Sequence, residues 1–144
     1  MASVADLLSM KDGEIHTIHR QASVLEAVRH MNRLSIGALV VMDEGQLVGM
    51  FTERDVLRVV GAGRSAETVR VEDVMSTDVV CADRDMEVEQ VAEIMKERRI
   101  RHLPVLNPLK HVVGLVSIGD INAMHVRQAE ATIASLNDYI FGRA

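Results

Sequence analysis

The chain has 144 residues, 48% of them hydrophobic and 26% charged, and a formal net charge of −5 at pH 7. This length suits one compact domain or two small repeats that share a core, and the negative charge argues against a nucleic-acid-binding protein. The single cysteine excludes an internal disulfide, and the absence of a membrane-length apolar run and of a secretory signal leads us to expect a cytoplasmic protein with no membrane or nucleic-acid partner.

The first half of the chain predicts a helix, a strand, a second helix, a hairpin and a closing helix. The 23–34 helix is indicated by apolar residues at helical spacing and by Ser23 as its N-cap. Asp43-Glu44-Gly45 is typical of a tight hairpin turn, and Gly61-Ala62-Gly63 ends the unit. The expected ranges are helix 4–8, strand 15–19, helix 23–34, strands 37–42 and 46–51, and a helix that starts at Thr52.

The second half repeats this order. Met31 matches Met95 and Leu39 matches Leu103 at a shift of 64 positions, and such self-similarity indicates a structural repeat. The expected ranges are helix 71–75, strand 78–82, helix 87–99, strands 102–106 and 112–116, a helix that starts at Ser117, and a final amphipathic helix at 128–141. We therefore predict an α/β (α+β) protein of two β-α-β-β-α repeats, packed sheet against sheet around one shared core and related by an approximate two-fold axis. Its expected parts are repeat 1 (1–62), a linker (63–70), repeat 2 (71–127) and a C-terminal helix (128–144).

One polar signature occurs in both halves. Gly49–Asp55 and Gly114–Asp120 both read Gly-apolar-apolar-hydroxyl-x-x-Asp, and each joins a predicted strand to a predicted helix. Helix capping explains one such copy without any ligand. A recurring pair fits a binding site better, because a carboxylate can accept two hydrogen bonds from a ribose diol and a helix N-terminus attracts phosphate. The nearby cations that could complete an anion site are Arg54, Arg58, Arg64, Arg101 and His102.

These residues resemble the tandem CBS-domain pair, or Bateman module, over nearly the whole chain. The strongest matches are segments 47–55, 101–105 and 113–120, and segments 63–65 and 136–140 are similar to the free-standing CBS-pair proteins of bacteria and plant mitochondria. The resemblance implies a non-catalytic regulatory module that binds an adenosine nucleotide between its repeats. It also implies a homodimer with four repeats in a flat disc, and a protein partner that senses the ligand-induced change.

The resemblance also implies two ligand sites, with the acid on the ribose, the hydroxyl residue at the phosphate and the adenine between apolar residues. One site would use Asp55, Thr52, Arg54, Gly37, Ala38 and Thr17, with Arg64 as a further cation. The other would use Asp120, Ser117, Gly119, Ile118, Arg101, His102, Leu103, Pro104, Val79, Val80 and Cys81. Because the first repeat has uncharged Gly37-Ala38 where the second has Arg101-His102, we expect unequal sites, with the Asp120 site the stronger.

AMP is the leading expected ligand, with ATP, ADP, NADH and S-adenosylmethionine as alternatives and no catalytic cofactor. The alternative function is a ligand-free dimerisation or interaction scaffold. An enzyme is not expected, since no nucleophile–base pair, acid pair or metal cluster has suitable spacing. His16 and His19 would face opposite sides of a strand, so no metal site is expected. Arg98 and Arg99 are expected to be solvated at a helix C-terminus.

Overall fold

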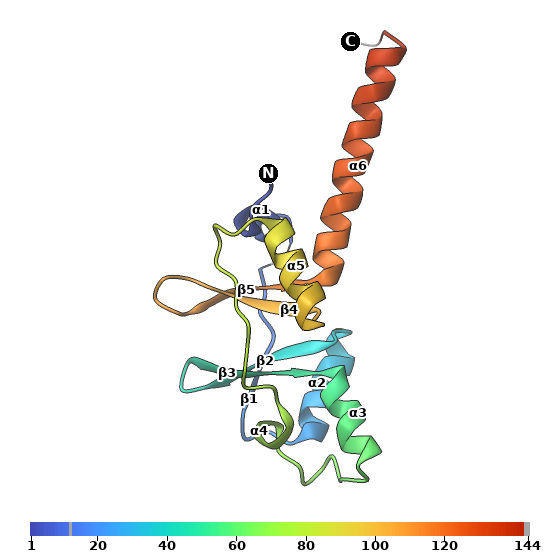
Figure 1. The fold of residues 1–144 in the computed structure, drawn as a ribbon. Coiled ribbons are helices and arrows are strands. Elements are labelled where there is room, and N and C mark those ends of the chain that lie inside the picture. The colour runs from blue at the N-terminus through green and yellow to red at the C-terminus, as the bar shows by residue number, and fades with distance from the viewer. Residues whose placement is uncertain (12, 143–144) are drawn as a thin grey trace.

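The computed structural model describes residues 1–11 and 13–142, and it places two small sheets with their helices one above the other (Figure 1). The first half contains α1 (Val4–Ser9), β1 (Thr17–His19), α2 (Val24–Leu34), β2 (Ala38–Asp43), β3 (Gln46–Thr52) and α3 (Glu53–Gly61). The second half contains α4 (Val71–Val74), α5 (Val88–Arg98), β4 (His102–Leu106), β5 (Val112–Ser117) and α6 (Ile118–Ile140). The predicted α/β class is confirmed, and the order helix, two-stranded hairpin, helix occurs in both halves.

The two sheets are not equivalent. In the first, β1 is parallel to β2 and β2 is antiparallel to β3, whereas the second holds only the antiparallel pair β4–β5. The strand predicted at 78–82 is wrong: only Ala82 forms a bridge, with Val105. The physical reason is that this segment crosses between the repeats, with Val79 packed at the boundary between the sheets and Val80 packed in the second repeat.

The helix ends follow local sequence closely. Ser23 caps α2 by accepting a hydrogen bond of 3.0 Å from the Glu26 N–H, as predicted. The C-cap residues are Ser35 after α2 and Arg99 after α5, and both lie in the left-handed backbone region, with φ of 54° and 55°. Because these two residues are 64 positions apart, the repeat extends to the backbone conformation of the helix C-cap.

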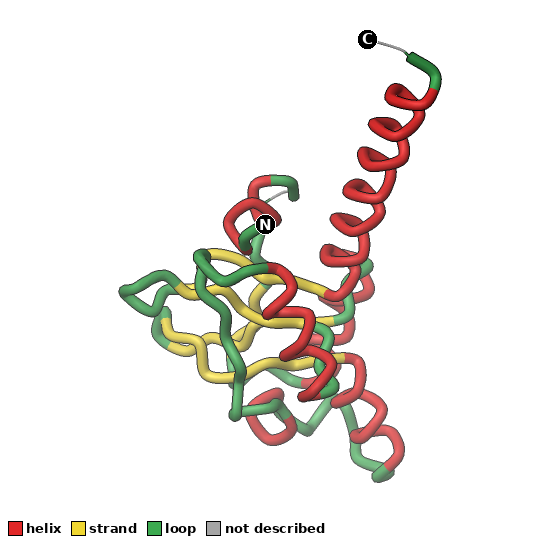
Figure 2. The backbone as a smooth tube through the Cα atoms, turned by 45° about the horizontal axis from the view of Figure 1, so that its top comes forward, coloured by secondary structure: helices red, strands yellow, loops and turns green. Residues whose placement is uncertain are grey.

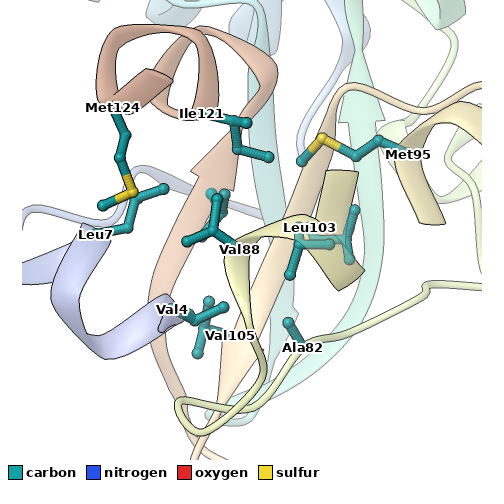
Figure 3. Close-up of a cluster of buried hydrophobic side chains, with 11 residues drawn as sticks. Val4, Leu7, Ala82, Val88, Met95, Leu103, Val105, Ile121 and Met124 are labelled. Carbon is teal, nitrogen blue, oxygen red and sulfur yellow. The ribbon is translucent and has the colours of Figure 1, made fainter. Parts of the chain in front are cut away.

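Three apolar clusters replace the single shared core that we expected. One belongs to the first repeat and one to the second, and a smaller cluster around Val40 and Met50 lies where the two sheets meet. The short helices are exchanged between the repeats. Val4 and Leu7 of α1 are buried among residues of the second repeat (Figure 3), and Val71 of α4 is buried in the first. Each core is therefore completed by a helix that adjoins the other repeat in sequence.

The C-terminal region is one continuous helix. We expected a helix from Ser117 and a separate one at 128–141, but α6 runs for 23 residues, and residues 143–144 of the expected C-terminal segment lie outside the described residues. No glycine or proline lies between residues 120 and 141 to interrupt it. Figure 2 shows its distal half extending away from both sheets. In the described part of the chain, no helix is apolar enough over a sufficient length to cross a bilayer.

Candidate ligand-binding cleft

A cleft of about 500 Å³ lies between the two repeats. Its first wall is the junction of β3 with α3, its second is the end of α5 with the start of β4, and the 76–80 segment closes it. The lining residues are Gly37, Met50, Thr52, Glu53, Arg54, Asp55, Leu57, Arg58, Ser76, Asp78, Val79, Val80, Arg98, Arg99, Ile100, Arg101 and His102. A cavity of this size, lined by both charged and apolar side chains, is large enough for a small-molecule ligand.

Asp55 is the buried acid of this cleft, with 2% of its surface exposed. Its Oδ2 accepts a hydrogen bond of 2.9 Å from the Thr52 N–H, and its Oδ1 lies 3.7 Å from Nη1 of Arg58. Burial raises the pKa of Asp55, although the Thr52 N–H and the Arg58 charge oppose that shift. Hydroxyl donors from a ligand would stabilise this partly desolvated carboxylate.

Arginines gather around the cleft although the chain as a whole is acidic. Five of its 16 basic residues line the cleft, against three acidic residues. Arg98 and Arg99 are among them, and both are exposed to solvent, as expected. Such a concentration of guanidinium groups favours an anionic ligand, because arginine binds phosphate and carboxylate in a bidentate geometry.

Gly37 leaves space for an acidic side chain at the edge of the cleft. A Cβ at this position would lie 3.1 Å from Oε1 of Glu53, and the Glu53 N–H donates to the Gly37 carbonyl at 3.1 Å. Gly37 therefore lets the first turn of α3 approach the start of β2 closely.

Asp120, the equivalent acid in the second repeat, is already paired within the chain. Lys11 Nζ donates to Asp120 Oδ2 at 2.7 Å and to the Leu115 carbonyl at 2.7 Å. Ser117 and Asp120 also form a reciprocal cap, with bonds of 2.9 and 3.2 Å. Burial alone would raise the pKa of Asp120, but the hydrogen bond from Lys11 and the Ser117 N–H outweigh it, and the pKa is lowered.

The space beside Asp120 is also small. The cavity that it lines with Lys11 measures about 70 Å³, against about 500 Å³ for the Asp55 cleft. The larger of these two cavities therefore lies beside Asp55, whereas the sequence led us to expect the stronger site at Asp120. Lys11 carries no local signal of this role, because its contact lies 109 positions away along the chain.

His102 lies at the start of β4 on the wall of the Asp55 cleft. Burial lowers the pKa of His102, helped by the charges of Lys11 and Arg101 and opposed by those of Glu53 and Asp120. The imidazole is therefore uncharged at neutral pH, and the arginines provide the positive charge.

The structure divides the residues predicted for the two sites differently. Four residues assigned to the Asp120 site line the Asp55 cleft instead, namely Val79, Val80, Arg101 and His102. They join Thr52, Arg54 and Gly37, which were assigned to the Asp55 site. The reason is that the end of α5 and the 76–80 segment face the first repeat across the boundary between the sheets.

The other residues predicted for the two sites lie outside the lining of the Asp55 cleft. Leu103 is wholly buried in the second-repeat core, Ala38 is buried between the sheets, and neither is among the residues that line the Asp55 cleft. The remaining predicted residues are Pro104, buried in β4; Cys81, half-buried with its pKa raised by burial; Ile118 and Gly119, in the first turn of α6; Thr17, exposed on β1; and Arg64, exposed beyond α3.

The cleft contains further residues that sequence reasoning did not assign to either site. Met50, Ile100 and Leu57 supply apolar surface, and Ser76 and Asp78 supply polar groups. Met50 lies within the Gly49–Asp55 signature and Leu57 lies two residues after it, so this signature is the signal that could have indicated them.

Two α/β repeats that form a cleft at their boundary define a tandem-repeat module. A sequence model of the CBS domain matches residues 4–62 and again 71–124. The chain therefore belongs to the CBS-domain family and carries two CBS repeats.

The relatives include free-standing CBS proteins. The chain is 33% identical to the mitochondrial CBS domain-containing protein CBSX3 of Arabidopsis thaliana, with 97% of this chain and 72% of that protein aligned. It is 31% identical to the CBS domain-containing protein YhcV of Bacillus subtilis, covering 95% of this chain and 96% of YhcV.

Solved structures share the fold. A putative signal-transduction protein with CBS domains from Burkholderia ambifaria has a TM-score of 0.85 at 35% identity, covering 88% of this chain and 95% of its own. The CBS domain pair of MJ0100, solved with 5′-methylthioadenosine and S-adenosylmethionine, has a TM-score of 0.80 at 27% identity, covering 89% and 98%. Regulatory modules of this family thus include one that binds adenosine-containing ligands.

Proposed function

We propose that the chain is a non-catalytic regulatory module that binds an adenosine nucleotide in the Asp55 cleft. The observation that carries the proposal is the combination of a buried carboxylate with five arginines in a cleft of about 500 Å³. In this arrangement Asp55 accepts hydrogen bonds from the ribose hydroxyls. Met50, Ile100 and Val79 provide apolar surface for adenine, and the arginines bind phosphate. MJ0100 supports the adenosine part, because that CBS pair was solved with two adenosine-containing ligands.

AMP remains the leading ligand, with ADP, ATP and NADH as close alternatives. The arginines favour these phosphate-bearing compounds over S-adenosylmethionine, whose sulfonium is positively charged. Binding across the cleft holds the two repeats in one relative position. A partner protein can sense this change only to the extent that the nucleotide prefers one arrangement of the repeats over the other.

The test is to identify what the protein binds. Mass spectrometry of small molecules released from the denatured protein, followed by calorimetric titration of the emptied protein with AMP, ADP, ATP and S-adenosylmethionine, is expected to show one phosphate-bearing adenosine ligand per chain. Protein that releases no nucleotide and gives no heat with any of the four compounds would contradict the proposal. That result would instead support the alternative of a ligand-free interaction scaffold, which the exposed apolar residues of α6 favour.

The affinity for AMP is expected to rise as the pH falls from about 8 to about 6, because of His102. A bound phosphate stabilises the imidazolium, so binding raises the lowered pKa of His102, and a group whose pKa rises on binding favours the complex at lower pH. We expect an increase of about two- to tenfold in the wild-type protein relative to His102→Gln. Calorimetric dissociation constants of both proteins across this range give the measurement. The phosphate of AMP itself titrates near pH 6 and affects both proteins equally. If the dissociation constants of the two proteins change with pH in the same way, His102 does not contact the phosphate.

A further inference from the structure

The distal half of α6 is a helix without a partner in the described chain. Ile121 and Met124 are the buried residues of α6, and every residue from Val126 to Ile140 is exposed. Figures 1 and 2 both show this part extending beyond the two repeats. At 1.5 Å per residue the exposed part is about 21 Å long.

Apolar side chains follow one face of this exposed helix in a seven-residue pattern. Val126, Ile133 and Ile140 are seven residues apart, and Ala129 and Leu136 follow the first two by three residues. This alternation of three and four residues is the heptad pattern of a coiled coil. We call these five residues the seam. Its four large side chains are 54–67% exposed, although apolar surface of this kind is normally covered.

The residue types of the seam point to a second copy of this chain as its partner. β-branched residues occupy the first heptad position (Val126, Ile133 and Ile140), and Leu136 occupies the fourth. Within parallel coiled coils, β-branched residues at the first position with leucine at the fourth favour two strands over three or four. We propose that residues 126–140 of two copies form a parallel two-stranded coiled coil.

The charges beside the seam permit this pairing. In a parallel pair, Glu130 of one copy lies beside the second copy's His125, whose Nε2 also lies 2.6 Å from Oε1 of Glu89 in its own chain. Thr132 lies beside the second copy's Asn137. No like charges meet across the helices, and the other two charged residues of this stretch, Arg127 and Asp138, lie on the outer positions. The seam also begins at residue 126, beyond the residues that the CBS-domain model matches, which end at 124.

Two heptads would form only a marginal helix pair as free peptides. In this chain the first turns of α6 are already packed against the second repeat, which nucleates the helix before association. The coiled coil does not depend on nucleotide, and so it is independent of the proposed function.

The test combines seam substitutions with a geometric cross-link in the full chain. Sedimentation equilibrium is expected to show a dimer whose dissociation constant rises at least about tenfold in Ile133→Glu/Leu136→Glu, because two charges per chain enter the apolar seam. The matched control, Ala131→Glu/Ser135→Glu, adds the same charge on the outer face of the helix and should leave the dimer intact. Since all four positions are exposed, circular dichroism should show unchanged folding of the two repeats.

The cross-link tests orientation. With the single native cysteine removed (Cys81→Ser), Ala129→Cys is expected to form a disulfide between copies on mild oxidation, because the fourth heptad positions of a parallel pair face each other. Ser135→Cys, on the outer face, should not form one. A monomeric wild-type protein, or a dimer that neither responds to the seam charges nor cross-links through position 129, would overturn the proposal.

Discussion

Replacing Asp55 with asparagine is expected to weaken AMP binding by about ten- to a hundredfold while leaving the protein folded. The asparagine amide oxygen can still accept the hydrogen bond from the Thr52 N–H, so the α3 cap is kept. What is lost is the negative charge that accepts the ribose hydroxyls, and hydrogen bonds to a charged group contribute about 1.5–3 kcal/mol each. Calorimetric titration with AMP gives the affinity.

The same variant has a distinct effect on stability. Because burial raises the pKa of Asp55, ionisation of this group opposes folding as the pH rises through its folded-state pKa, and a neutral amide removes this cost. Asp55→Asn should therefore be at least as stable as the wild-type protein at neutral pH. Thermal unfolding in the absence of nucleotide checks this, and it separates a loss of binding from a loss of structure.

Asp120→Asn is the matched control. It removes the ion pair with Lys11, which is partly exposed, and it lies at the small cavity, so AMP binding should change by less than about threefold. The opposite result, with Asp120 essential and Asp55 dispensable, would show that the ligand binds at the Asp120 site, as we expected from the sequence. If both substitutions have negligible effects on AMP binding, neither Asp55 nor Asp120 contacts the ligand.

Replacing Gly49 with alanine is expected to lower the free energy of unfolding by about 2–3 kcal/mol. A Cβ at this position would lie 2.6 Å from Sδ of Met75 and 2.8 Å from the Ser76 carbonyl oxygen. The Ser76 carbonyl cannot easily retreat, because Met50 and Ser76 exchange two backbone hydrogen bonds of 2.9 Å. The alanine is therefore accommodated only by moving one backbone segment away from the other.

Gly114→Ala, the equivalent change in the second repeat, should be milder, at about 1 kcal/mol or less. The nearest atoms to the added Cβ are the methyl groups of Leu8, at 2.7 and 2.8 Å, and these can turn away without backbone movement. Urea unfolding curves for both variants provide the comparison, with the change read from the midpoint at a constant slope. Equal losses of unfolding free energy in the two variants would show that the close backbone contact at Gly49 does not make the first repeat more sensitive than the second.

Local patterns predicted most of the fold. The α2 helix, both hairpins and the two signature helices follow from spacing and caps that neighbouring residues determine, and the structure confirms them. The segment 78–82 could not be predicted in this way, since its apolar residues are typical of a strand but pack between two repeats. Its course depends on tertiary contacts that no local pattern contains.

For the candidate sites, too, local patterns predicted some residues, whereas others depend on tertiary contacts. The signature correctly indicated Asp55 and Thr52 as neighbours of a cleft, because the acid and the cap lie within one helical turn. The basic residues across the cleft were assigned to the Asp120 site. Arg101 and His102 line the Asp55 cleft in the structure, although His102 also pairs with Ser117 in the β4–β5 hairpin. Only the three-dimensional structure shows Lys11 on Asp120.

Because α1 and α4 are exchanged, the sequence repeat and the folding unit are not the same. Each sequence repeat begins with a short helix that packs in the core of the other repeat. In each repeat the signature glycine makes room for the arriving segment: Gly49 for Met75, just after α4, and Gly114 for Leu8 of α1. A single repeat on its own would leave its short helix without a core to enter, and it could complete that core only by taking the same helix from a second copy. The 144-residue chain is thus built like a domain-swapped dimer of half-length subunits joined end to end.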